Sequence, residues 1–202
     1  MSSPFFIAAF VVGFLILGFF MHRREKAKIK PVFDAVAKKY QGTVSHPLLG
    51  MPQLVIKRQG SVLRITAMSR SLDTPQGGGE ITCIDFDIGK TAAGNFRVQE
   101  QSDFKRTAVP KALMGKNQPF TTGMREFDAR FASCASNATQ AIRILKDPSL
   151  SKTMLAMPRG ADIRVQDGRC YVSVDGHPQD VAFVDRLMLT ADCLIESLAG
   201  SE

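Results

Sequence analysis

The sequence predicts an α+β fold, in which an N-terminal transmembrane helix is followed by a cytoplasmic antiparallel sheet packed with helices on one face. Three observations predict it. An uncharged apolar run fills residues 4–21. Behind it, short segments of alternating apolar and polar residues come in pairs separated by turn dipeptides, which is typical of hairpins. Residues 178–199 carry a broad apolar stripe at helical spacing, as in a helix that lies on a sheet.

The apolar run has the length of a membrane span. As a helix, residues 4–21 would extend about 27 Å, close to the hydrocarbon thickness of a bilayer. No basic residue precedes the run and no small-residue cleavage site comes after it, so we expect an uncleaved anchor rather than a signal peptide. By the positive-inside rule, residues 1–3 would be an extracytoplasmic tail and the C-terminal domain would be cytoplasmic. This predicts a single-pass protein of the cell inner membrane.

A basic segment comes directly after the run. Residues 22–30 hold five basic residues and one acid, and so account for +4 of the formal net charge of +7. Such a segment beside an apolar helix is expected to contact anionic lipid headgroups of the bilayer. A nucleic-acid surface is not expected, because no basic stripe with interleaved aromatic residues occurs elsewhere. The residues predicted to contact the membrane surface are Arg23, Arg24, Lys26, Lys28 and Lys30.

Residues 31–202 are expected to form one domain, or two halves of about 31–105 and 125–202. Pro31 should end any helix from the membrane, because it lacks a backbone N–H. A short amphipathic helix then extends as far as Tyr40. Its apolar face could lie on the membrane or on its own domain, and we expect the domain.

The first half of the domain shows strand patterns. Segments 54–58 and 61–68 flank Gln59-Gly60 and predict a hairpin with one buried face. Strands over 80–88 and 95–101 are expected to complete a four-stranded antiparallel meander.

The second half begins after an irregular region, residues 107–124, which is rich in Pro and Gly. Alternation over 126–134 predicts a strand, and Asn137 has the position of a helix N-cap. A second short helix should begin after Asp147-Pro148. The Asp167-Gly168 dipeptide predicts a hairpin of segments 161–166 and 169–174.

Catalytic and cofactor motifs are weak throughout. Gly89-Lys90-Thr91 resembles the end of a phosphate-binding loop, but the required earlier glycine is Ile84. The carboxylates of Asp85 and Asp87 could form an acid–base pair, although a solvated strand face is the expected role. We therefore expect no enzyme activity, no cofactor and no metal.

The histidines and cysteines support the same expectation. His22, His46 and His177 are far apart in the sequence, so a metal site would need a tertiary convergence that no local pattern predicts. The cysteines lie inside predicted elements without metal-ligand or disulfide spacing, and we expect buried free thiols. They are Cys83, Cys134, Cys170 and Cys193.

The segment Phe127-Asp128-Ala129-Arg130-Phe131, together with the helix predicted after it, resembles a family of uncharacterised bacterial membrane-anchored proteins. In that family an F-D-x-x-F strand precedes a short helix, a hairpin and a closing helix. The resemblance covers about the last third of the chain and rests on pattern. It implies a bacterial inner-membrane protein of unknown function and assigns no functional residue.

Two functions remain open, together with an enzyme of unfamiliar type. The leading hypothesis is a non-enzymatic, membrane-tethered interaction or scaffold module with an unknown protein partner, and homo-oligomer formation is a further possibility. The alternative is a small-molecule or lipid-binding module. Its pocket would lie between sheet and helices, with residues 107–124 as a lid.

Overall fold

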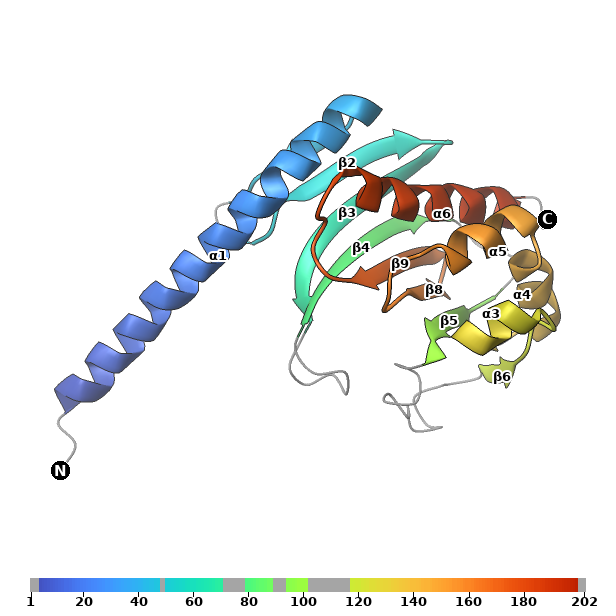
Figure 1. Cartoon of the computed structure of the whole chain (residues 1–202), viewed down its shortest axis with the longest axis horizontal. Helices are drawn as coiled ribbons and strands as arrows, with labels where there is room; N and C mark the ends of the chain where they lie inside the picture. The colour runs from blue at the N-terminus through green and yellow to red at the C-terminus, as the bar shows by residue number, and fades with distance from the viewer. Residues whose placement is uncertain (1–3, 48–49, 71–78, 89–93, 102–116, 200–202) are drawn as a thin grey trace.

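The computed structural model describes residues 4–47, 50–70, 79–88, 94–101 and 117–199. Its described strands form one antiparallel nine-stranded sheet in the order β1-β2-β3-β4-β9-β8-β5-β7-β6. Helices α3 to α6 lie together over one face of this sheet, and α1 is a long rod whose N-terminal part extends away from the domain (Figure 1).

The elements succeed one another with short connections in the described parts of the chain. The helices are α1 (Pro4–Tyr40), α3 (Arg125–Arg130), α4 (Ala138–Leu145), α5 (Pro148–Leu155) and α6 (Val181–Ala199). The strands are β1 (Thr43–Ser45), β2 (Gln53–Arg58), β3 (Ser61–Arg70), β4 (Gly79–Asp87), β5 (Phe96–Glu100), β6 (Gln118–Phe120), β7 (Phe131–Ala135), β8 (Asp162–Gln166) and β9 (Arg169–Asp175).

Both predicted hairpins are confirmed. In β2–β3, Arg58 pairs with Ser61 across Gln59 and Gly60, whose φ values of 51° and 77° fit a turn with two left-handed residues. In β8–β9, Asp167 and Gly168 have φ values of 51° and 80°. The predicted apolar faces of the two hairpins are buried, namely Leu54, Ile56, Leu63, Ile65, Ile163, Val165, Cys170 and Val172.

The predicted four-stranded meander is wrong at its last step. Strand β4 pairs with β9, and β5 pairs with β8 and β7, so the C-terminal hairpin lies between β4 and β5. The alternation of Phe96 and Val98 correctly marks a half-buried strand. A pattern of alternation does not specify the neighbour, which is why the insertion of β8–β9 escaped prediction.

The predicted strand over 126–134 also needs correction. Residues Arg125–Arg130 form helix α3, and only Phe131–Ala135 form strand β7. The Asp128 carboxylate accepts hydrogen bonds from the backbone N–H groups of Thr122 and Gly123 at 2.9 and 2.8 Å, which fixes the entry to the helix. This local hydrogen bonding competes with an extended backbone.

The caps of the next two helices agree with the sequence. The Asn137 side chain accepts a hydrogen bond from the Gln140 N–H at the start of α4. The Asp147 side chain accepts one from the Leu150 N–H at the start of α5, where Pro148 occupies the first turn. The predicted closing helix is α6, whose buried residues include Val184, Leu187 and Met188.

The predicted transmembrane helix over residues 4–21 is wrong. Within the described ranges, no helix is both long and apolar enough to cross a membrane. This finding overturns the membrane anchor in the predicted fold class, the single-pass topology with the N-terminus outside and a cytoplasmic domain, and the inner-membrane location. The apolar run belongs to a longer element: α1 has 37 residues and continues through Pro31 to Tyr40.

The predicted break at Pro31 is likewise wrong. Pro31 lies inside α1 and is exposed, so its ring faces away from the domain. Ile29 and Phe33 on either side of it are fully buried, as is Val36 one turn further on. We attribute the continuity of the helix to this burial, which offsets the cost of one missing backbone hydrogen bond.

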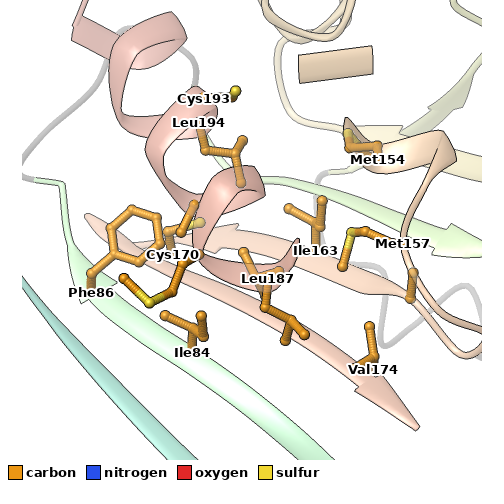
Figure 2. Close-up of a cluster of buried hydrophobic side chains, with 14 of the residues drawn as sticks. Ile84, Phe86, Met154, Met157, Ile163, Cys170, Val174, Leu187, Cys193 and Leu194 are labelled. Carbon is orange, nitrogen blue, oxygen red and sulfur yellow. The ribbon is translucent and has the colours of Figure 1, made fainter. Parts of the chain in front are cut away.

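The hydrophobic core lies between the sheet and its helices. Figure 2 shows Ile84 and Phe86 of β4, Cys170 and Val174 of β9, and Leu187 of α6 directed into one cluster. These side chains are fully buried. These apolar side chains lie between the sheet and the helices. The alternative function, a small-molecule or lipid-binding module, placed its pocket in this layer.

Candidate functional site

Helix α1 joins the domain through its C-terminal half. Polar contacts add to its buried apolar residues. The Lys39 Nζ lies 2.6 Å from Asp185 Oδ2 on α6, and the Tyr40 hydroxyl donates to Asp185 Oδ1 at 2.8 Å. The hydrogen bond from Lys39 to Asp185 raises the pKa of Lys39 above its ordinary value. These contacts hold the helix, and hence everything along it, in a defined orientation on the body.

The end of α1 fits tightly against β2. The helix ends at Tyr40, the next residue Gln41 has a φ of 55°, and the Gly42 N–H donates to the Ala37 carbonyl at 2.9 Å. A Cβ atom at Gly42 would lie only 2.8 Å from the Val55 carbonyl oxygen. Glycine is therefore required there by close approach of the backbone.

The basic flank is the name we give to the five basic residues predicted as a lipid contact. The structure places them on α1 between its free end and its docked end, and four of the five are exposed. Lys26 is half-buried and its Nζ donates to the Pro47 carbonyl at 2.9 Å. The exposed members are Arg23, Arg24, Lys28 and Lys30.

Apolar side chains are exposed beyond the flank. Phe10 is 75% exposed, and Val11 and Val12 are 50% and 54% exposed. This part of α1 extends away from the sheet (Figure 1). Neighbouring large apolar side chains exposed to this degree mark an interaction surface more often than single ones do.

The predicted acid–base pair is part of an ion-pair network. Asp85 Oδ2 lies 2.8 Å from Arg169 Nη2 and 3.4 Å from Arg64 Nη1. Asp87 contacts the same two arginines at 3.3 and 3.6 Å. Both carboxylates are paired with guanidinium groups across neighbouring strands, so their role in the structure is cross-strand ion pairing.

The predicted buried thiols are confirmed for three cysteines, and Cys83 is half-buried. Burial is the largest cause of the raised pKa at each of them, and it raises the pKa of Cys83 to about 12, with Asp85 adding to the effect. A nucleophilic cysteine needs a lowered pKa. These thiols are therefore not activated.

The histidines have separate surroundings. His46 Nε2 lies 3.6 Å from Asp34 Oδ1 at an exposed position. His177 Nε2 lies 2.8 Å from Glu80 Oε1, and Glu25 of α1 joins this pair. The members of this cluster come from three distant segments, so no local pattern in the sequence predicts it. Residues 89–93, which include the phosphate-loop-like tripeptide, lie outside the described residues.

One open hollow of about 410 Å³ lies near α3, lined by Glu100, Gln101, Glu126, Ala129 and Arg130. The guanidinium group of Arg130 is already hydrogen-bonded within the protein. Arg130 donates to the carbonyls of Leu155, Met157 and Pro158 at the end of α5, at 2.5, 2.8 and 3.1 Å. Arg130 thus ties α3 to α5, and this accounts for a charged residue lining the hollow.

Comparison with known proteins concerns the fold. No protein-family model matches the chain, and no curated protein matches it. The chain is similar to the crystal structure of the mycobacterial trehalose monomycolate transport factor A, TtfA, with a TM-score of 0.54 and 12% sequence identity. The similarity covers 84% of this chain and 94% of that chain. At this identity the likeness shows a shared fold and no shared residues of function.

Proposed function

We propose that the chain is a non-enzymatic binding module that contacts anionic lipid through the basic flank of α1. The observation that carries the proposal is the placement of the flank. Four exposed cations lie on a helix whose other end is fixed to the domain by buried apolar residues and by Asp185. A fixed helix presents its charges without the entropy cost of ordering a loose segment.

The energetics favour a lipid surface. Each Lys or Arg near an anionic bilayer contributes about 1 kcal/mol, and the attraction fades within about 8 to 10 Å at physiological salt. The exposed apolar side chains at Phe10 to Val12 lie on the same helix, about 16 Å or more before the charges, and offer a second contact area. A helix that presents both apolar and cationic parts matches the two parts of an amphiphile.

The structural neighbour supports the same class of ligand. Its name refers to transport of trehalose monomycolate. We extend to this chain only the class, an amphiphilic lipid. The enzyme alternative gains no support from the unactivated thiols or from the carboxylates held by arginines.

Vesicle sedimentation tests the proposal. The full chain is mixed with phosphatidylglycerol-containing vesicles or with pure phosphatidylcholine vesicles at several salt concentrations. We expect binding to the anionic vesicles that weakens as salt rises. A triple variant, Arg24→Gln, Lys28→Gln and Lys30→Gln, should lose most of it.

A matched triple variant provides the control. Lys57, Lys146 and Lys152 are exposed lysines on β2, after α4 and on α5, and changing all three to Gln removes the same charge. We expect this variant to bind as the unaltered chain does. Equal losses in the two triple variants would show that only net charge matters and would overturn the role of the flank.

A further inference from the structure

We propose that Glu25, Glu80 and His177 form a binding site for a divalent transition-metal ion of the Zn²⁺ class. One ligand atom from each residue lies within 4.8 Å of the other two. The three residues come from α1, from β4 and from the connection between β9 and α6. The proposal does not depend on lipid binding.

Two members of the cluster are held in a fixed relation. The Gly176 N–H donates to the Glu80 carbonyl at 2.7 Å, and the buried Thr82 hydroxyl donates to the Gly176 carbonyl at 2.7 Å. Gly176 has a φ of 94°, which glycine adopts without strain. The connection that carries His177 is thereby fastened to the start of β4, beside Glu80.

His177 is the residue that points to a ligand. Its side chain is only 13% exposed, and both ring nitrogens are inaccessible without a hydrogen-bond partner among the described residues. The Glu80 carboxylate lies 2.8 Å from Nε2 but does not form an aligned hydrogen bond. A buried polar atom left without a hydrogen bond costs free energy, and a metal ion would remove that cost at the ring nitrogen to which it binds.

The charges point the same way. Glu25 and Glu80 bring two carboxylates of like charge next to one imidazole. A divalent cation between them would replace repulsion by attraction. One nitrogen and two oxygen ligands suit transition metals such as Zn²⁺, since an all-oxygen set would instead favour Mg²⁺ or Ca²⁺.

The spacing requires a small closure on binding. Ligand atoms at about 2.0 to 2.2 Å from a tetrahedral Zn²⁺ lie roughly 3.3 to 3.6 Å apart. Glu25 lies on a helix surface and is half-buried, so rotation of its side chain can close the remaining gap. Three protein ligands leave one position for water or for a further ligand.

Such a site would connect α1 to the sheet well before its docked end. Glu25 lies between Arg24 and Lys26 of the basic flank, 15 residues before the end of α1 at Tyr40. A metal ion bound there would fasten this part of the helix to β4 and β9. The metal ion would also neutralise the negative charge of Glu25, which lies among the basic residues of the flank.

Metal titration of the tag-free, reduced full chain tests the site. After treatment with a chelator, Zn²⁺ is added in a calorimeter, and Co²⁺ is added in a spectrophotometer. We expect one equivalent of Zn²⁺ to bind. The Co²⁺ spectrum should lack the intense thiolate-to-metal band, because no cysteine belongs to the cluster.

Variants assign the ligands. We expect Glu25→Gln, Glu80→Gln and His177→Gln each to weaken Zn²⁺ binding by at least the ten- to hundredfold that even second-shell changes cause. His46→Gln, at the exposed histidine, should leave binding unchanged. Because His177 is largely buried, circular dichroism must first show that its variant is folded, and Glu25→Gln, on the surface of α1, gives an independent result.

Hydrogen exchange provides the second readout. Zn²⁺ should slow amide exchange around Glu25 in the unaltered chain but not in Glu25→Gln. Absence of saturable Zn²⁺ binding, a thiolate band with Co²⁺, or full binding by both Glu80→Gln and His177→Gln would overturn the proposal.

Discussion

Lys39 and Asp185, 146 positions apart in the chain, form an ion pair with 2.6 Å between Nζ and Oδ2. The same carboxylate accepts a hydrogen bond from Tyr40. The end of α1 is thus joined to α6, the helix that covers the middle of the sheet (Figure 1). These contacts predict how the stability of the docked helix depends on pH.

Asp185→Asn should lower the melting temperature at neutral pH, and the difference from the unaltered chain should vanish in alkali. The pKa of Lys39 is raised by its hydrogen bond with Asp185, and that of Tyr40 is raised by burial and then by Asp185. A raised folded-state pKa gives stability that is complete below the ordinary values of 10.5 and 10.0 and is lost as pH rises through the folded-state values. Melting curves from pH 7 upward measure it, and a difference that stayed constant through this range would contradict the prediction.

Phe33→Ala should destabilise the whole domain by about 3 to 5 kcal/mol, because Phe33 is fully buried in the core. Phe10→Ala removes the same ring from the exposed part of the same helix and should change the free energy of unfolding by less than about 0.5 kcal/mol. Urea unfolding measures both. Similar small effects would show that α1 is not an integral part of the domain.

Gly42→Ala should cost about 1 to 3 kcal/mol, because the new methyl group would meet the backbone of Val55 and the side chain of Ile56. Gly79→Ala is the matched control, since a Cβ atom there has no neighbour within 4 Å. Its effect should be within about 0.5 kcal/mol. Equal costs at the two positions would refute a tight junction between α1 and β2.

Local features of this fold could be predicted from the sequence. The two hairpins are indicated by Gln59-Gly60 and Asp167-Gly168, because turn residues and alternation together specify a register. The N-cap at Asn137 depends on a hydrogen bond within four residues. Such features involve neighbours in the chain, and a sequence displays those neighbours directly.

One error, the missed helix α3, concerns local hydrogen bonds to Asp128, and the others concern contacts between distant segments. Nothing in β4 indicates that β9 will be its partner, and nothing around Pro31 indicates that α1 will continue through it. The apolar run predicted a membrane span by its length, its lack of charge and its basic flank, whereas the described residues contain no helix long and apolar enough to cross a membrane. The cluster of Glu25, Glu80 and His177 could not be predicted for the same reason, since its three segments meet only in the folded chain. The family resemblance and an unknown protein partner stay predictions.

The most direct test of lipid contact through α1 uses the absence of Trp from the chain. Two single-Trp variants are compared: Ala27→Trp on the exposed side of α1, and Leu189→Trp at a 53% exposed position on α6. On addition of anionic vesicles, the emission of the first variant should shift to shorter wavelength, while that of the second should not change. A shift of both variants, of neither, or only of the α6 variant would contradict the account.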